Sequence, residues 1–272
     1  MPANSPIVSL RECRRLHSRK ERQASGRFLV EGIRPVRAAL MSPARIEVVL
    51  YVPESLRDGY GQETIDLARS RNVPCQPLTS TQFSSISTRE NPRGIAAIGR
   101  QAWSDLDQLA TTTAPIVVLH EPQDPGNLGT ILRTCDAAGA AGVVLTGNAT
   151  DPWHPTALRA AMGATFAIPL VRCDVTTFVA WGRSLSIAII GTSDRAATDY
   201  ATREYDDRFV LLMGSERQGL PMSLEAIADD MVRIPMAGQA DSLNLAVATS
   251  LVLYEARNQR VRRAVAALAF GS

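Results

Sequence analysis

The sequence predicts an α/β protein with mainly parallel sheets. Short apolar runs alternate with helical stretches from one end of the chain to the other, which is the pattern of strand–helix–strand units. The chain also has 272 residues, of which 45% are hydrophobic and 21% are charged. A chain of this length and composition can bury the core of one large domain or of two domains of ordinary size.

The first hundred residues carry four of the apolar runs. We expect strands at residues 27–32, 46–52, 74–79 and 94–99. The next segment, "RQAWSDLDQLATTTAP" at 100–115, is polar and rich in threonine, a composition typical of a linker between domains. The predicted first domain therefore spans 1–102, with a linker over 103–114.

The rest of the chain, 115–272, predicts one doubly wound domain. Six strands separated by helices make a sheet of the usual size for such a domain. We expect these strands at residues 115–119, 142–147, 166–171, 186–193, 209–214 and 231–236.

Overall charge and cysteine spacing exclude several classes of protein. The net charge of +2 does not by itself indicate a polyanionic partner. No two of the four cysteines form a C-x-x-C pair, which argues against a zinc site and a disulfide framework. The sequence shows neither a signal-peptide core nor an apolar run as long as a membrane span. We therefore expect a cytoplasmic protein without a bound metal.

Basic residues cluster near the N-terminus. Between residues 11 and 37, nine basic residues stand against three acidic ones, a local excess of +6 in a chain of +2. Such clusters bind nucleic-acid phosphates, but they are equally typical of a solvated helix face, and both interpretations stay open. On the first interpretation, the residues expected to contact RNA are Arg11, Arg15, Arg19, Lys20, Arg22 and Arg27.

A glycine-bearing loop, "EPQDPGNLGTILRTCDAAGA" at 121–140, follows the strand expected at 115–119. A dinucleotide-binding turn begins in this way, but it requires G-x-G-x-x-G and an acidic residue about 20 positions later. Here Gly126 and Gly129 lack a third glycine one turn on, and no acidic residue directly follows the next expected strand. The sequence therefore disfavours an NAD-dependent oxidoreductase.

Three further glycine-bearing loops follow apolar strands, at 189–193, 211–221 and 234–246. Open α/β sheets bind ligands at the carboxyl ends of their strands, so the three loops together predict a small-molecule site. The last loop leads into an apolar helix, "SLNLAVATSLVLYEARNQ" at 242–259, with Ser242 as its expected N-cap. A helix apolar on most sides must be buried in the fold or covered by a second subunit.

Three segments of distinct composition occur in order: "NLGTILRT" at 127–134, "LLMGSERQGLP" at 211–221 and "IPMAGQADSLNLAVATSLVLYEA" at 234–256. In this order they resemble the three motifs of the TrmH/SpoU family of RNA ribose 2′-O-methyltransferases, within the SPOUT superfamily. The basic opening and "RFLVEG" at 27–32 resemble the small L30e-like RNA-binding domain that many members carry in front.

This resemblance implies a knotted (trefoil) SPOUT methyltransferase domain, S-adenosyl-L-methionine as methyl donor, and a homodimer formed through the knotted domain. It also implies an RNA substrate. The positions that match the family's cofactor site are Thr192, Leu212, Met213, Gly214, Ile234, Met236, Ser242 and Leu243.

The resemblance also makes Arg133 the central catalytic residue. A guanidinium stays protonated at ordinary pH, so it is a poor general base. We favour Arg133 as a group that holds the phosphate beside the target ribose and stabilises the developing alkoxide. Asn127 and Asn244 are expected to orient the hydroxyl and the loops, with Glu216 supporting them by a charged hydrogen bond.

The sequence leaves more than one candidate for the RNA substrate. A front domain of the ribosomal-protein type favours 23S ribosomal RNA, with a role in resistance to a ribosome-targeting antibiotic left open. Transfer RNA is the alternative substrate, and a non-catalytic RNA-binding protein of the same fold is the alternative function. The non-catalytic alternative is disfavoured by the intact motif residues Asn127, Arg133, Glu216, Ser242 and Asn244.

Overall fold

The structure, a computed structural model, describes residues 7–56 and 59–270 and divides into two compact units. Unit 1 contains residues 1–102 together with 151–167, and unit 2 contains 103–150 together with 168–272. The division after residue 102 agrees with the expected first domain. The membership of 151–167 differs from the expectation, because this segment from the second half of the sequence packs into unit 1.

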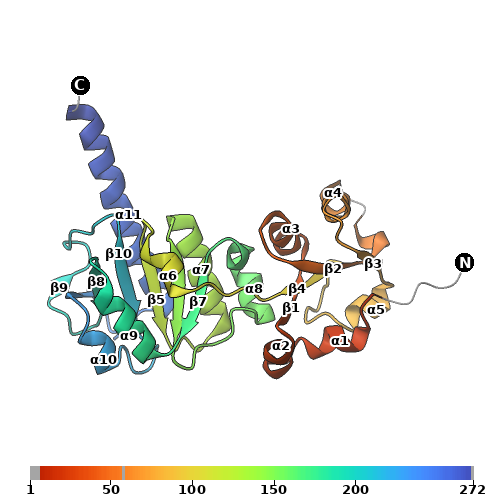
Figure 1. Cartoon of the computed structure of the whole chain (residues 1–272), viewed down its shortest axis with the longest axis horizontal. Helices are drawn as coiled ribbons and strands as arrows, with labels where there is room; N and C mark the ends of the chain where they lie inside the picture. Colours follow the sequence, from red (N-terminus) through yellow and green to blue (C-terminus); the bar gives the residue numbers. More distant parts are fainter. Residues whose placement is uncertain (1–6, 57–58, 271–272) are drawn as a thin grey trace, which may run out of the picture. The chain divides into compact units, whose positions relative to one another are not determined.

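A four-stranded sheet in the order β1-β4-β2-β3 forms the centre of unit 1 (Figure 1). β4 pairs antiparallel with β1 and β2, and only β3 pairs parallel with β2. The expectation of mainly parallel sheets is therefore wrong for this unit, because the last strand inserts between the first two. The strands lie at the expected places, as β1 (Arg27–Glu31), β2 (Ile46–Tyr51), β3 (Cys75–Pro77) and β4 (Ile95–Arg100).

Short helices cover this sheet, and local capping explains where two of them begin. Ser9 and Glu12 form a reciprocal capping box at the start of α1, and Thr79 and Gln82 do the same for α5. The helices of the N-terminal part are α1 (Leu10–Arg15), α2 (Arg19–Ser25), α3 (Ile33–Met41), a 3₁₀ turn at Pro53–Ser55, α4 (Gly59–Ser70) and α5 (Ser80–Ser84).

The segment 151–167 completes the core of unit 1. It contains α8 (Pro155–Ala161) and a 3₁₀ turn (Ala164–Phe166). The Trp153 ring stacks on the Phe28 ring of β1, with 5.0 Å between the ring centroids. The centroid of the Phe166 ring lies 5.3 Å from that of Phe28. Because aromatic rings bury large apolar areas, these contacts account for the segment's place in unit 1.

Unit 2 is built on a seven-stranded sheet in the order β7-β6-β5-β10-β8-β11-β9 (Figure 1). Every strand pair in it is parallel, as predicted. The short strand β9 was not expected, and β7 begins later than expected because residues 164–166 form the 3₁₀ turn of unit 1. The strands are β5 (Ile116–His120), β6 (Gly142–Thr146), β7 (Leu170–Cys173), β8 (Ala188–Thr192), β9 (Thr198–Asp199), β10 (Phe209–Met213) and β11 (Asp230–Arg233).

Helices cover both faces of the seven-stranded sheet. One face packs against α6 (Leu106–Ala110), α9 (Val175–Ser184) and α10 (Met222–Glu225), whose apolar residues share one core cluster with the strands. Helix α7 (Pro125–Ala138) contacts α11 (Leu245–Phe270), and both lie on the other face (Figure 1). The expected linker is therefore partly folded, since Leu109 of α6 is buried in this core.

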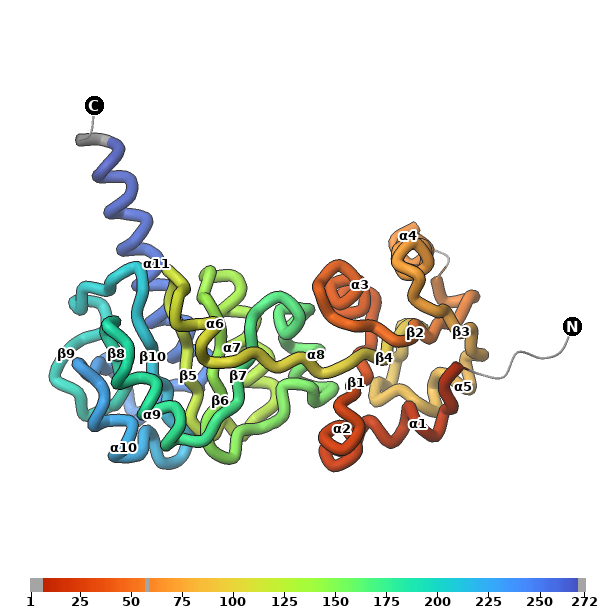
Figure 2. The backbone as a smooth tube through the Cα atoms, viewed as in Figure 1, coloured from red at the N-terminus to blue at the C-terminus, as the bar shows by residue number. Residues whose placement is uncertain are grey.

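Helix α11 has two halves of different character. Its first half packs against α7, with Val252, Leu253 and Ala256 buried. Its second half runs away from the sheet of its unit (Figure 2), and residues 261–268 are all exposed. The helix was expected at 242–259, buried in the fold or covered by a second subunit. Its own fold covers part of that stretch, and α11 continues to Phe270, beyond the expected end. Among the described residues, no helix combines the length and apolarity needed to cross a bilayer.

Candidate active site at the carboxyl ends of the parallel strands

The order in which the chain adds strands to the sheet of unit 2 reverses between β5 and β10. From β5 the chain builds outward through β6 and β7, then returns to the other side of the sheet as β8, with β10 inserted beside β5. In open α/β sheets the loops that diverge at such a switch point leave a crevice in which ligands bind. The first expected motif, 127–134, lies in α7, which follows β5, and the second, 211–221, covers the end of β10 and the loop after it. Hydrogen bonds from Gln123 and Asn127 to Glu216 join these two regions.

Local sequence sets where α7 begins beside this switch point. Asp124 is the N-cap, and its Oδ1 accepts a hydrogen bond of 2.7 Å from the backbone N–H of Asn127. Pro125 follows at the first helical position, where its fixed φ suits a helix start and its missing N–H costs nothing. Asn127 therefore stands in the first turn of α7 with a defined backbone.

Asn127 joins two distant parts of the chain by hydrogen bonds. Its Nδ2 lies 3.3 Å from Oε1 of Glu216, in the loop after β10. Its Oδ1 accepts from Nδ2 of Asn244 at 2.9 Å, just before α11. Oδ1 of Asn244 in turn accepts from the backbone N–H of Ala246 at 2.9 Å. The structure thus brings Glu216, Asn127 and Asn244 into one hydrogen-bonded chain.

The groups at the two ends of this hydrogen-bonded series decide the orientation of the side-chain amides of Asn127 and Asn244. An ionised carboxylate only accepts hydrogen bonds, so Glu216 requires the NH₂ group of Asn127 to face it. The N–H groups at the start of α11 only donate, so they require the carbonyl oxygen of Asn244. One hydrogen on each asparagine amide nitrogen is left over. The site therefore presents N–H donors of fixed direction.

Asn244, and not the expected Ser242, caps α11. The helix begins at Leu245, and Oδ1 of Asn244 accepts from two of its first backbone N–H groups. Ser242 is exposed, two residues further from the helix start than a cap would be. The serine is therefore free for another role.

Arg133 lies outside the hydrogen-bonded chain. It is on α7 six residues after Asn127, which places it about 120° round the helix axis and about 9 Å along it. Its side chain is exposed and, within the part of the chain that the structure describes, has no hydrogen-bond or ion-pair partner. An exposed guanidinium without a partner is available to a phosphate from outside the chain.

Three of the expected cofactor residues, Thr192, Leu212 and Met213, lie at the carboxyl ends of β8 and β10. The hydroxyl of Thr192 donates to the carbonyl oxygen of Leu212 at 3.0 Å, which joins the two strand ends. Leu212 and Met213 are buried. Gly214 follows, and a Cβ there would lie 2.2 Å from the carbonyl carbon of Gly219. Only glycine therefore allows the loop that carries Glu216 to fold back so closely.

The remaining cofactor residues lie in the loop 234–243 between β11 and α11. Among the described residues, this loop makes no backbone–backbone hydrogen bond. Its N–H and C=O groups therefore have capacity for a ligand, since backbone groups in a site otherwise need partners. Ile234 and Leu243 are half-buried, whereas Met236 and Ser242 are exposed. The loop thus offers apolar side chains beside open backbone groups.

The expected RNA contact by Arg22 is wrong. Arg22 is fully buried, and its Nε donates to Oδ2 of Asp151 at 2.7 Å. Its Nη1 donates to the carbonyl oxygens of Leu16 and His17. A charge run in the sequence does not distinguish a surface arginine from one that pairs with a carboxylate 129 residues away. This guanidinium belongs to the core of unit 1.

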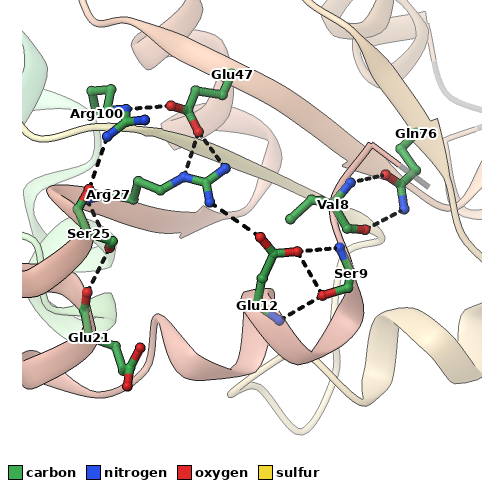
Figure 3. A network of polar contacts seen from close by, with 9 residues as sticks. All are labelled: Val8, Ser9, Glu12, Glu21, Ser25, Arg27, Glu47, Gln76 and Arg100. Carbon is green, nitrogen blue, oxygen red and sulfur yellow. Dashed lines mark hydrogen bonds and ion pairs between the residues drawn. The ribbon is translucent and has the colours of Figure 1, made fainter. Parts of the chain in front are cut away.

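Arg27 is also engaged within unit 1, as Figure 3 shows. Its guanidinium pairs with Glu47 at 2.6 Å and lies 3.7 Å from Glu12. Arg100 holds the other oxygen of Glu47. The role of Arg27 in RNA binding stays a prediction, and its charge is largely balanced by these carboxylates. The other four predicted contacts are exposed on or beside α1 and α2: Arg11, Arg15, Arg19 and Lys20.

Other titratable groups have structural roles. Burial lowers the pKa of His120, whose Nδ1 lies 3.1 Å from the hydroxyl of Thr146. Burial raises the pKa of Cys13 to about 11 and that of Cys173 to about 11, so both are thiols at neutral pH. Within the described ranges, no group of three or more His, Cys, Asp or Glu residues is arranged to hold a metal.

The fold is that of a doubly wound α/β protein, with a candidate ligand site at the switch point of its parallel sheet. Residues 114–254 match the model of the SpoU rRNA Methylase family, and residues 8–97 match an MRM3-like substrate binding domain. The chain belongs to the SpoU rRNA methylase family, as its motifs predicted.

Relatives of this chain match along almost their whole length. The 23S rRNA (guanosine(2553)-2′-O)-methyltransferase RlmP of Bacillus subtilis (strain 168) is 32% identical, over 91% of this chain and 95% of its own. The 23S rRNA (uridine(2479)-2′-O)-methyltransferase of Streptomyces viridochromogenes is 31% identical, over 90% of this chain and 88% of its own.

Solved structures of relatives confirm the fold class. The AdoMet-bound rRNA methyltransferase from Sinorhizobium meliloti matches with a TM-score of 0.83 and 37% identity, over 92% of this chain and 94% of its own. The SpoU methyltransferase AviRb from Streptomyces viridochromogenes, in complex with the cofactor AdoMet, matches with a TM-score of 0.81 and 29% identity, over 93% and 97%.

Proposed function

We propose that this protein transfers a methyl group from S-adenosyl-L-methionine to a ribose 2′-hydroxyl of RNA. The observation that carries the proposal is the hydrogen-bonded chain of Glu216, Asn127 and Asn244 at the switch point. These three residues come from the three motifs of the family. Relatives over nearly the whole chain are named 23S rRNA 2′-O-methyltransferases, which supports the same reaction.

In this proposal the residues of the site align the ribose hydroxyl with the methyl donor and stabilise the developing alkoxide. S-adenosylmethionine supplies a methyl group activated on a sulfonium, so the protein must mainly orient the ribose oxygen and help it lose its proton. Arg133 holds the phosphate beside the target ribose, and its charge stabilises the developing alkoxide. The spare N–H groups of Asn127 and Asn244 orient the hydroxyl. Glu216 keeps the amide of Asn127 turned in the required direction.

The cofactor is expected to lie between the loops after β8, β10 and β11. The residues present fit such a group, because the loop 234–243 leaves its backbone donors and acceptors open beside half-buried Ile234 and Leu243. AdoMet-bound structures of relatives support the identity of the cofactor. We assign cofactor binding to Thr192, Leu212, Met213, Gly214, Ile234, Met236, Ser242 and Leu243.

The proposed substrate is 23S ribosomal RNA, with transfer RNA as the alternative. Residues 8–97 match a substrate binding domain model, and four of the predicted RNA contacts there are exposed. With this substrate we expect the protein in the cytoplasm, where ribosomes are assembled. A role in antibiotic resistance depends on which nucleotide is modified.

Methyl transfer to defined RNAs tests this function. The purified protein is incubated with tritiated S-adenosylmethionine and unmodified transcripts of 23S ribosomal RNA, 16S ribosomal RNA or transfer RNA. We expect label in 23S RNA only, and a single 2′-O-methyl nucleotide by mass spectrometry of nuclease fragments. Label confined to transfer RNA would establish the alternative substrate. Tight RNA binding without label in any RNA would establish the non-catalytic alternative.

We also infer that the C-terminal domain is knotted and that the protein forms a homodimer through it. An apolar stripe on α11 supports this inference. Its exposed members recur at intervals of three, four or seven residues, the spacing of helix-pairing positions. Their exposed fractions range from 40% to 82%, and they are Val247, Tyr254, Val261, Val265 and Leu268. A second copy of the chain would remove this stripe from water.

Charges placed on the stripe should separate the dimer. Glutamates at Val261 and Val265 would be buried without partners in a helix interface, so we expect the double variant to elute as a monomer in light-scattering chromatography. Glutamates at Ala266 and Ala267 are the matched control, because about 100° per residue turns both side chains away from the stripe. A wild-type chain that is monomeric at micromolar concentration would contradict the inference.

A further inference from the structure

Gln123, in the loop between β5 and α7, joins two loops of the candidate site. Its Nε2 lies 2.8 Å from the carbonyl oxygen of Glu121 and 3.3 Å from that of Asn148. Asn148 belongs to the loop after β6, the neighbouring strand of the sheet. Both hydrogens of one amide nitrogen are therefore donated, one to each loop. The side chain of Gln123 fastens the two loops together.

The same junction is held by Glu121 in an unusual backbone conformation. Glu121 has φ of +48°, a left-handed conformation that residues other than glycine rarely adopt. Its Oε1 accepts from the backbone N–H of Asn148 at 3.0 Å. Its Cγ would lie 2.6 Å from a Cβ on Gly147. Such a conformation persists only where the surrounding contacts impose it, so this junction is under strong local constraint.

The backbone of Gln123 faces the catalytic network. Its N–H points to Oε2 of Glu216 at 3.4 Å, while Oε1 of Glu216 accepts from Asn127 at 3.3 Å. The carboxylate is thus held on two sides by long hydrogen bonds. Long hydrogen bonds are sensitive to small displacements of either partner. The place of Glu216 therefore depends on how firmly the backbone at Gln123 is held.

We propose that Gln123 is a positioning residue for methyl transfer. By joining the loop after β5 to the loop after β6, its side chain holds its own backbone N–H against Glu216. Glu216 then keeps the amide of Asn127 turned toward it. This inference rests on the proposed function, and Gln123 itself contacts neither substrate nor cofactor in it. Gln123 lies before the first family motif, and no motif position assigns it a role.

The test is a double-mutant cycle on the full-length protein. Gln123→Leu removes both amide donors at nearly constant volume and is expected to lower kcat for methyl transfer by about tenfold or more. The KM for S-adenosylmethionine should change by less than about twofold. In a Glu216→Gln background the same change should lower kcat no further, because Gln123 acts through Glu216. Gln108→Leu is the matched control, an exposed glutamine on α6.

Two outcomes would overturn the proposal. One is an unchanged kcat for Gln123→Leu, and the other is an equal loss in both backgrounds, which a general structural effect would produce. Hydrogen exchange of the bridged loop from Ser215 to Gly219 gives a readout without catalysis. If the wild-type protein transfers no methyl group, the proposed function fails. Faster exchange in Gln123→Leu would then still support the holding role, and unchanged exchange would exclude it.

Discussion

Replacing Arg133 by alanine is expected to lower kcat for methyl transfer to 23S RNA by about 10²–10³-fold, the usual cost of removing one electrostatic stabiliser. Within the described residues, the Arg133 side chain has no partner. Its loss therefore breaks no internal contact, and the melting temperature should be unchanged. The KM for S-adenosylmethionine should also be unchanged, because the proposed partner of Arg133 is RNA. Initial rates with tritiated donor over a range of RNA concentrations measure these values.

Two further variants give this prediction its control. Arg133→Lys keeps the positive charge but loses the planar fork, so we expect an activity between those of the wild type and Arg133→Ala. Arg183→Ala removes another exposed arginine of unit 2, on α9, and should have wild-type activity. The proposed role of Arg133 would be wrong if Arg133→Ala kept more than about a tenth of the wild-type kcat.

Replacing Arg22 by methionine is expected to lower the free energy of unfolding by about 3–5 kcal/mol, because it leaves a buried charge without its partner. Asp151 is 4% exposed, and its other oxygen already accepts from the backbone N–H of Trp153. Among the described residues, Arg22 is the cation paired with Asp151. Denaturant titration followed by far-ultraviolet circular dichroism should show an earlier transition.

The double variant Arg22→Met with Asp151→Asn separates the charge from the packing. Asparagine keeps an acceptor for Trp153 but removes the uncompensated charge, so stability should recover by about 1 kcal/mol or more relative to Arg22→Met alone. Arg45→Met is the control, since Arg45 is exposed in the same unit. Equal stabilities of Arg22→Met and Arg45→Met would show that the buried ion pair contributes nothing.

The pattern of apolar residues predicted where most strands lie, but it did not predict which strands pair with one another. The apolar runs located both outer strands of the first sheet, β1 and β3, at their observed places. They did not show that β4 lies between β1 and β2. Strand order depends on hydrogen bonds between distant segments, and such bonds leave no periodic trace in a sequence. The same holds for the two-residue strand β9, which is too short to form an apolar run.

The candidate site was predictable where a motif carries it. Asn127 and Asn244 are 117 residues apart, yet the family resemblance named both, and the structure joins them by a hydrogen bond. Asp124 stands immediately before Pro125 and three residues before Asn127, a spacing from which a helix cap can be predicted. Gln123 carries no such signal, because its role arises from the carbonyl oxygen of Asn148 on another loop.

By itself the sequence determined the family and most of the elements, and it predicted the side chains that we propose for catalysis. These depend on local periodicity and on motifs that are continuous in the chain. Only the tertiary structure decided that Arg22 is a core residue while Arg11 stays exposed, and that 151–167 belongs with unit 1. Burial and charge pairing depend on which distant groups come within a few ångströms, and only the folded chain sets those distances.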